Sequence, residues 1–237
     1  MRTIAIVQAR MGSSRLPKKV MKEVLGRPMI GFLLERLSKS NKLDQIVLAT
    51  SKKSLDRVLA SYVKKLGFPV ILGSENDVLD RYYRAAKEFK PNNIVRITGD
   101  CPLIDPSLID KIICNFFEKD VDYLSNIWPR TFPKGLDIEV FTFEALERAV
   151  SETTNPYDRE HVTPYIRESG NFKVANFTNE IDCSMERWTV DWQEDFDLIK
   201  KIFESFSPRV NFSWEEILEL RMRNSQLFEV NEHLIDK

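Results

Sequence analysis

Short apolar runs alternate with amphipathic segments through the first half of the chain. The runs contain many β-branched residues, which is typical of buried strands. Between them, apolar residues recur at helical spacing, as in the series Ile30, Leu33, Leu34, Leu37. The pattern predicts strands over Ile4–Val7, Ile46–Thr50, Pro69–Leu72 and Ile94–Thr98, and helices over Met29–Ser40, Ser54–Leu66, Val78–Phe89 and Pro106–Glu118.

This alternation predicts βαβ units and therefore a mostly parallel sheet. Ligands of such sheets bind at the carboxyl ends of the strands. The loops that follow Val7, Thr50 and Thr98 are therefore the first places to look for a functional site.

The second half of the chain is less regular. It contains no linker, internal repeat or low-complexity segment, so we expect one domain over residues 1–225 and a less ordered C-terminal tail over 226–237. The predicted strands are Asp122–Asn126, Leu136–Phe141, Lys173–Phe177 and Trp188–Val190, and the predicted helices are Thr142–Val150, Tyr157–Glu168, Glu194–Phe206 and Trp214–Asn224.

Composition narrows the class of protein. The net charge is −1, which gives no overall attraction to nucleic acid, and no apolar run approaches the roughly 20 residues that span a membrane. The chain enters a strand directly at its start, and its three cysteines lack metal-ligand spacing. We therefore expect a cytoplasmic protein that binds neither nucleic acid nor membrane.

The segment QARMGSSRLPKK, residues 8–19, directly follows the first predicted strand. A glycine-containing turn allows close approach of the backbone, and the nearby cations can neutralise a polyphosphate. The segment matches neither the P-loop nor the GxGxxG pattern. A solvated basic turn remains the alternative. The residues concerned are Arg10, Gly12, Ser13, Ser14, Arg15, Lys18 and Lys19.

Two aspartates end short apolar segments. Asp100 follows Ile94–Thr98, and Asp191 follows Trp188–Val190. Two carboxylates together with substrate phosphates are a typical ligand set for Mg²⁺. The alternatives are a turn aspartate for Asp100 and a helix-starting residue for Asp191. Asp105 is predicted to cap the helix that begins at Pro106.

These motifs resemble the signatures of the sugar cytidylyltransferases, which include the CMP-sialic acid and CMP-3-deoxy-manno-octulosonate synthetases. QARMGSSRLPKKVM matches the pattern ARxGSxRLPxK, and ITGDCPLIDP and TVDWQEDFDLI resemble the second and third signatures. GSENDVLDRYYRAA, KGLDIEVF and YDREHVTPYIRES are similar to the subgroup linked to spore-coat polysaccharide biosynthesis.

The resemblance implies a Rossmann-like α/β fold of the nucleotide-diphospho-sugar transferase type, a three-layer sandwich with a mostly parallel mixed sheet. It also implies a homodimer. It assigns nucleotide binding to Ala9, Arg10, Gly12, Ser13, Arg15, Lys19 and Asp100, catalysis to Lys19, Arg15, Asp100 and Asp191, and Mg²⁺ binding to Asp100 and Asp191.

The segment WPRTFPKGLDIEVF lies where this family binds the acceptor sugar. Arg130 or Lys134 could pair with a sugar carboxylate, and a solvated loop is the alternative. His161 could reach the acceptor, although a packing histidine is the commoner case. The acceptor candidates are Arg130, Lys134, Asp137, Glu139 and His161.

The expected function is therefore Mg²⁺-dependent transfer of CMP from CTP to a sugar, expected to be acidic and ulosonate-like, with release of pyrophosphate. Such an enzyme would serve the synthesis of a surface polysaccharide or glycan. The alternatives are a nucleotidyltransferase with another nucleotide or a sugar-phosphate acceptor, and a non-catalytic protein that binds nucleotide sugars.

Overall fold

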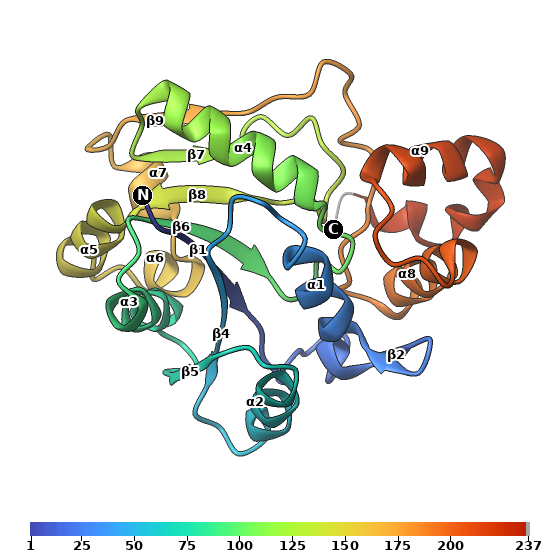
Figure 1. Cartoon of the computed structure of the whole chain (residues 1–237), viewed down its shortest axis with the longest axis horizontal. Helices are drawn as coiled ribbons and strands as arrows, with labels where there is room; N and C mark the ends of the chain where they lie inside the picture. Colours follow the sequence, from blue (N-terminus) through green and yellow to red (C-terminus); the bar gives the residue numbers. More distant parts are fainter. Residues whose placement is uncertain (236–237) are drawn as a thin grey trace.

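In the computed structural model, which describes residues 1–235, seven strands form a central sheet between two layers of helices (Figure 1). The strand order is β5-β4-β1-β6-β8-β7-β9, and β8 runs antiparallel to both of its neighbours. The predicted mostly parallel mixed sheet is confirmed. The strands are β1 (Thr3–Gln8), β4 (Gln45–Ser51), β5 (Val70–Gly73), β6 (Asn93–Thr98), β7 (Tyr123–Ser125), β8 (Glu139–Thr142) and β9 (Val174–Asn176).

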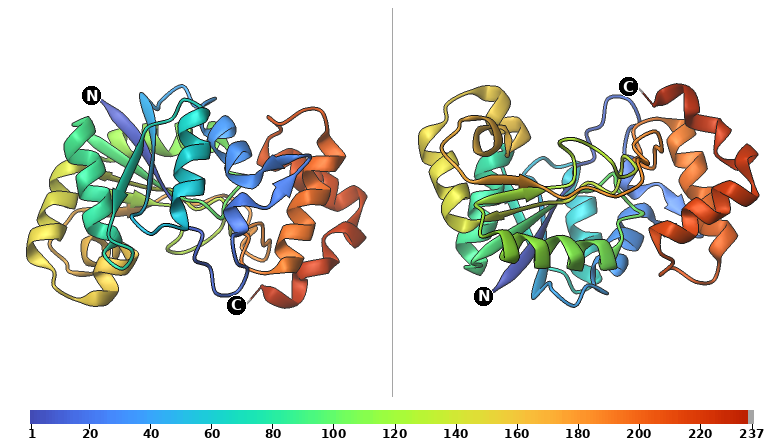
Figure 2. Two further views of the ribbon diagram at one scale, coloured as in Figure 1. Left: turned by 90° about the horizontal axis from the view of Figure 1, so that it is seen from below. Right: turned by 90° about the horizontal axis from the view of Figure 1, so that it is seen from above.

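Helices cover both faces of the sheet (Figure 2). One face packs against α1 (Met29–Leu37), α2 (Asp56–Lys65) and α4 (Pro106–Lys119), and the same core continues into α8 (Gln193–Phe206) and α9 (Trp214–Arg223). The opposite face packs against α3 (Val78–Phe89), α5 (Phe143–Glu152) and α7 (Pro164–Glu168), and α6 (Pro156–His161) packs against α3 and α7. No helix in residues 1–235 is long and apolar enough to cross a membrane.

The burial of β1 explains why its sequence is apolar without alternation. Ala5 and Val7 belong to the core on one face of the sheet, whereas Ile4 and Ile6 belong to the core on the other. A central parallel strand is covered on both sides, so both sets of side chains must be apolar. The four strands predicted in the first half are all present.

Asp105 caps α4 as predicted and also connects two distant helices. Its Oδ1 accepts hydrogen bonds from the backbone N–H groups of Ser107 and Leu108 at 2.8 and 3.0 Å. Its Oδ2 accepts from the backbone N–H of Trp214 at 2.8 Å, at the start of α9. The cap therefore also fixes the C-terminal helices against the sheet layer.

Two predicted elements are wrong. The expected helix Tyr157–Glu168 is divided into α6 and α7, because Val162 has a positive φ of 74° and Pro164 begins the second helix. The expected strand Trp188–Val190 lies outside the sheet. Its backbone instead bonds to loop residues, with the N–H of Trp188 donating to the carbonyl of Lys134 at 2.7 Å.

Short elements that periodicity did not predict complete the fold. β2 (Glu23–Val24) and β3 (Arg27–Pro28) form a two-stranded ribbon after the 3-10 helix Lys19–Met21. The expected tail contains 3-10 helices over Ser225–Leu227 and Glu229–Leu234. Phe228 is buried between them, so this part of the chain is folded. Residues 236 and 237 lie outside the described residues. The domain boundary at residue 225 stays a prediction.

Candidate active site

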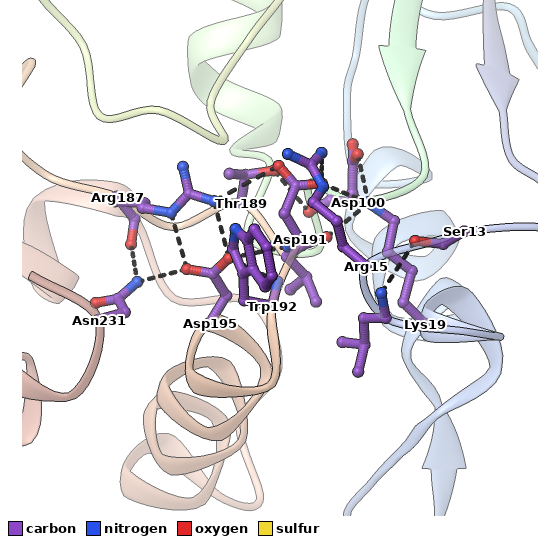
Figure 3. A network of polar contacts seen from close by, with 12 residues as sticks. Ser13, Arg15, Lys19, Asp100, Arg187, Thr189, Asp191, Trp192, Asp195 and Asn231 are labelled. Atoms are coloured by element: carbon purple, nitrogen blue, oxygen red, sulfur yellow. Dashed lines mark hydrogen bonds and ion pairs between the residues drawn. The ribbon is translucent and has the colours of Figure 1, made fainter. Parts of the chain in front are cut away.

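A lysine ammonium group joins the two aspartates that the sequence analysis selected (Figure 3). Nζ of Lys19 donates hydrogen bonds to Oδ2 of Asp100 and Oδ1 of Asp191, each at 2.9 Å. It also donates to the carbonyl oxygen of Val190 at 2.7 Å. Three predicted catalytic residues therefore meet at one point, although 172 positions separate Lys19 from Asp191.

Close packing of loops holds Asp100 in place. A Cβ built on Gly99 would lie 2.6 Å from Cβ of Ala9, so a glycine is needed where the loop after β6 meets the loop after β1. The backbone N–H of Val190 and the hydroxyl of Thr189 donate to the carbonyl oxygen of Asp100 at 2.8 and 3.3 Å. The extended segment before Asp191 is thereby fastened to Asp100.

A buried ion pair supports Asp191 from the other side (Figure 3). Arg187 donates from Nε and Nη2 to the two carboxylate oxygens of Asp195, each at 2.9 Å. Oδ2 of Asp195 also accepts from the backbone N–H groups of Asp191 and Trp192, at 2.9 and 3.0 Å. Nδ2 of Asn231 donates to Oδ1 of Asp195 at 2.9 Å and to the carbonyl of Arg187 at 3.0 Å.

The sequence analysis missed the roles of Arg187, Asp195 and Asn231. Arg187 and Asp195 flank Asp191 at four positions on either side, but that spacing alone does not indicate an ion pair. Asn231 comes from the C-terminal 3-10 helix, which no periodic pattern marks. These contacts are tertiary, so only the folded chain reveals them.

Two arginines of the basic loop bind carboxylates at the surface. Nη2 of Arg15 lies 2.8 Å from Oδ1 of Asp191, and its guanidinium lies 5.7 Å from the centre of the Trp192 ring. Nη1 of Arg10 lies 3.6 Å from Oε1 of Glu75. Both arginine side chains are more than 40% exposed, so they can turn toward an entering phosphate at little cost.

A pocket of about 440 Å³ opens beside this cluster, at the carboxyl ends of β1 and β6. It contains every residue predicted to bind the nucleotide, as well as Asp191 and His161. The sequence analysis did not select Val78 and Arg81 from α3, which also line it. The lining residues are Gln8, Ala9, Arg10, Gly12, Ser13, Ser14, Arg15, Lys19, Val20, Val78, Arg81, Thr98, Gly99, Asp100, Glu160, His161 and Asp191.

Four of the five predicted acceptor-binding residues, all except His161, are not among the residues that line this pocket. Arg130 forms a two-point ion pair with Asp137, with Nη1–Oδ1 and Nη2–Oδ2 distances of 2.5 and 2.9 Å. The backbone of Lys134 bonds to the carbonyl of Glu186 at 2.8 Å and to the N–H of Trp188 at 2.7 Å. These contacts bring the segment around Lys134 against the segment that leads to Asp191.

Glu139 is placed differently from the expectation. Its side chain is buried, and its carboxylate accepts hydrogen bonds from Arg96 at 2.5 Å, Tyr123 at 3.0 Å and Thr163 at 3.1 Å. In this structure Glu139 therefore pairs with Arg96 across β6 and β8, and its contact with a substrate stays a prediction.

Charges of opposite sign stabilise one another in the cluster. Burial by itself lowers the pKa of Lys19, but the carboxylates of Asp100 and Asp191 outweigh it and raise that pKa. Burial by itself raises the pKa of Asp100, but Lys19 and hydrogen bonds lower it overall. Burial raises the pKa of the Cys101 thiol, which disfavours the reactive thiolate form.

The oxygen atoms around Lys19 fit a hard metal ion. Two carboxylate oxygens, of Asp100 and Asp191, and the carbonyl oxygen of Val190 all face one cation, the ammonium of Lys19. Mg²⁺ prefers such oxygen donors and completes its shell with water and phosphates. Residues 1–235 contain no group of three or more His, Cys, Asp or Glu side chains suited to a metal. Two carboxylates leave room in such a shell for substrate oxygens.

A basic loop and two convergent aspartates, beside the carboxyl ends of β1 and β6, indicate a nucleotidyltransferase of the class that lacks a P-loop. The family model described as "Cytidylyltransferase" matches residues 4–230. The chain therefore belongs to the cytidylyltransferase family. Membership confirms both the resemblance seen in the sequence and the expected class of enzyme.

Two curated relatives are similar over nearly the whole chain. A Methanocaldococcus jannaschii protein, MJ1063, is 40% identical over 100% of this chain and 97% of its own length. The Bacillus subtilis spore coat polysaccharide biosynthesis protein SpsF is 34% identical over 92% of this chain and 93% of its own length. The subgroup that the sequence indicated is thus represented among the relatives.

Solved structures agree with the fold. A cytidylyltransferase from Leptospira borgpetersenii superposes with a TM-score of 0.92 at 37% identity, over 97% of each chain. A CMP:2-keto-3-deoxy-manno-octonic acid synthetase complexed with CTP gives a TM-score of 0.67 at 15% identity, over 87% of this chain and 100% of its own. The second likeness concerns the fold alone. Together they confirm the nucleotide-diphospho-sugar transferase type of fold.

Proposed function

We propose that this cytidylyltransferase transfers CMP from CTP to a hydroxyl group of an acidic sugar, with Mg²⁺ as the divalent cation and pyrophosphate as the second product. The observation that carries the proposal is the meeting of Lys19, Asp100 and Asp191 at the wall of a pocket that is lined by most of the basic loop. The family and the sugar-related relatives support it.

The residues of the loop would act on the triphosphate. Arg10 and Arg15 are exposed enough to leave their carboxylate partners and bind the phosphates. Lys19 would donate to the oxygens that gain charge as the bond between the α-phosphorus and pyrophosphate breaks. Catalysis by such groups consists of positioning and charge neutralisation, and it needs no covalent nucleophile.

Asp100 and Asp191 would hold the metal ion, which supplies positive charge to the reacting phosphate when it is bound. Lys19 now occupies the point that these carboxylates face, so its ammonium group would move toward the phosphates when substrate and metal bind. Arg187 and Asp195 would keep the backbone of Asp191 in place throughout.

An acidic acceptor fits the charges beside Asp191. Burial and then the guanidinium groups of Arg187 and Arg130 lower the pKa of Lys134, although the carboxylates of Asp191 and Asp137 act in the opposite direction. An anionic group on the sugar would relieve this repulsion. Arg130 and Asp137 would contribute to the acceptor site as an ion pair, and His161 would lie at the rim of the nucleotide pocket. The homodimer and the cytoplasmic location stay predictions.

A matrix of reactions tests the function. Pyrophosphate release would be measured with CTP, UTP, ATP and GTP against neutral, carboxylated and phosphorylated sugars, with and without Mg²⁺. We expect release only with CTP, Mg²⁺ and a carboxylated sugar. Release of pyrophosphate with a phosphorylated sugar would contradict the proposed carboxylated acceptor and support a sugar phosphate. A preference for another nucleotide would contradict the proposed use of CTP.

A further inference from the structure

The ammonium group of Lys19 lies at the point that a metal ion held by Asp100 and Asp191 would also need. Its Nζ is 2.9 Å from one carboxylate oxygen of each aspartate and 2.7 Å from the carbonyl oxygen of Val190. A magnesium ion would lie at about 2.0–2.1 Å from each oxygen that it binds. An ammonium nitrogen and a metal ion cannot both lie between the same oxygens, so the two cations compete for them.

The backbone segments that carry the two carboxylates are fixed to each other. The backbone N–H of Val190 donates to the carbonyl oxygen of Asp100 at 2.8 Å. The backbone N–H of Asp191 donates to Oδ2 of the buried Asp195 at 2.9 Å. Movement of the two segments apart would break these contacts. Exchange of the ammonium group for a metal ion is therefore favoured over accommodation of both.

Lys19 is fixed at its backbone, whereas its side chain is long and flexible. The backbone N–H of Lys19 donates to the carbonyl oxygen of Leu16 at 3.2 Å, and the side chains of Leu16 and Val20 are buried. Its ammonium group ends a carbon stem with several rotatable bonds. Lys19 lines the same pocket as Ser13 and Arg15. The ammonium group can therefore turn from the aspartates toward a phosphate in the pocket while the loop stays in place.

The formal charges of this cluster balance. Arg15 contacts the same Asp191 oxygen as Lys19, at 2.8 Å, so two cations face the carboxylates of Asp100 and Asp191 (Figure 3). The side chains of Lys19 and Asp191 are only 12% and 13% exposed, so water screens the charges weakly. A divalent ion that entered alone would add an uncompensated double positive charge, which Coulomb repulsion opposes. A triphosphate brings the negative charge that Lys19 and Arg15 need once they leave the carboxylates.

We propose that Lys19 acts as a tethered cation, which keeps Mg²⁺ from binding to Asp100 and Asp191 until a triphosphate is present to receive its ammonium group. The inference rests on the proposed role of the two aspartates as metal ligands. It makes the binding of the metal ion and of the nucleotide cooperative. The cooperativity is reciprocal, because each ligand lowers the free-energy cost of binding the other.

The binding of a metal ion alone tests the proposal. Electron paramagnetic resonance would measure the binding of Mn²⁺, which prefers the same oxygen ligands as Mg²⁺, without nucleotide or sugar. We expect Lys19→Met to bind Mn²⁺ at least about tenfold more tightly than the unaltered protein, because the competing charge is removed. Lys18→Met is the matched control, because it removes the same charge from the exposed neighbouring residue and should leave the affinity unchanged. Equal affinities of Lys19→Met and the unaltered protein would overturn the proposal.

A double variant locates the ion. The gain in Mn²⁺ affinity should disappear when Lys19→Met is combined with Asp100→Asn, because one of the two carboxylates is then lost. It should persist when Lys19→Met is combined with Asp120→Asn, since the Asp120 side chain is 97% exposed. If the gain persists without the carboxylate of Asp100, the ion binds elsewhere and the proposal is contradicted.

A measurement on the unaltered protein does not depend on the folding of Lys19→Met. Nuclear magnetic resonance detects lysine ammonium groups that hydrogen bonds hold in place. The signal of Lys19 is identified by its loss in Lys19→Arg, which keeps the positive charge. Mg²⁺ alone should leave this signal unchanged, whereas Mg²⁺ with CTP should shift or remove it. The same response to Mg²⁺ alone as to Mg²⁺ with CTP would overturn the proposal.

The two proposals fail in different ways. The Mn²⁺ measurements contain neither nucleotide nor sugar, so they do not depend on the base or on the acceptor. A protein that releases pyrophosphate from CTP but gains no metal affinity in Lys19→Met keeps the proposed function and contradicts only the role assigned to Lys19. A preference for another nucleotide contradicts the proposed use of CTP and leaves the role of Lys19 in place.

Discussion

Arg187 and Asp195 form a two-point ion pair, and the same Asp195 oxygen that bonds Arg187 also accepts the backbone N–H of Asp191. The pair is almost completely buried, with side chains 1% and 0% exposed. A structural contact thus fixes the backbone of a predicted catalytic residue. This support comes from two residues that do not line the pocket.

The two aspartates are expected to be necessary for turnover. Asp100→Asn and Asp191→Asn should each reduce pyrophosphate release by about 10³-fold or more, because each removes a charged oxygen that faces the cation position. Circular dichroism would verify folding. Asp120→Asn is the control, since the Asp120 side chain is 97% exposed and remote from the cluster. Near-normal turnover in either variant would exclude that residue from the site.

Lys19 is expected to matter for nucleotide binding as well as for catalysis. Lys19→Met should weaken CTP binding by about 1.5–3 kcal/mol, the usual value of a charge-assisted hydrogen bond. Its neighbour Lys18 is exposed, so Lys18→Met should change the affinity far less. Calorimetry measures both. If Lys19→Met binds CTP as tightly as the unaltered protein, the alternative interpretation of the loop as a solvated basic turn is supported.

Gly135 is expected to be intolerant of a side chain. It has a φ of 113°, and a Cβ there would lie 2.5 Å from the backbone nitrogen of Thr189. Gly170→Ala is the matched control, because Gly170 also has a positive φ, of 75°, but has open space around it. Gly135→Ala should lower the free energy of unfolding, measured in urea, by at least about 1 kcal/mol more than Gly170→Ala does. Equal losses of unfolding free energy in the two variants would contradict this, because they would show that the backbone at Thr189 moves to admit the added methyl group.

The C-terminal segment is expected to stabilise the site through Asn231. Asn231→Ala removes two buried hydrogen bonds, to Asp195 and to the carbonyl of Arg187, and should cost about 1–3 kcal/mol of folding free energy. Gln226→Ala, at an exposed position, serves as the control. Thermal unfolding compares the two. A melting temperature equal to that of the unaltered protein would contradict the role of Asn231.

Asp195 is expected to contribute to acid sensitivity. Burial by itself raises its pKa, but hydrogen bonds from Arg187, Asn231 and the backbone outweigh it and lower the pKa. A depressed pKa stabilises the fold above the unfolded value of about 3.9, and this part is lost as the pH falls toward the lower folded value. Asp195→Asn should flatten the stability profile below about pH 4, whereas Asp120→Asn should not. Parallel profiles for the two variants would refute this.

Much of the site could be predicted because it lies in one continuous loop and at two strand ends. β1 and β6 are buried on both faces, so their apolar runs are unambiguous and mark the loops that follow. Lys19 and Asp100 lie in those loops, whereas Asp191 follows an apolar segment outside the sheet, and the structure places all three together.

Other parts depend on tertiary contacts that no local pattern carries. Arg81 has the sequence appearance of an ordinary arginine on an amphipathic helix, and only packing against Gly73 buries it. Trp188–Val190 reads as a strand because it is apolar, yet its backbone pairs with the loops at Lys134 and Asp100. Glu139 lies in a predicted strand, but the sequence does not reveal that Arg96 on the adjacent strand pairs with it.

The ammonium contacts of Lys19 span 81 and 172 positions of the chain. Forming a contact between such distant residues costs loop-closure entropy. Such contacts are therefore expected to form after local ones. The strands and helices of the first half can assemble from neighbouring segments, whereas the catalytic cluster must wait for the segment around Asp191 to arrive. Nucleotide-binding competence is therefore expected to appear late in refolding, after most of the helical signal has been regained.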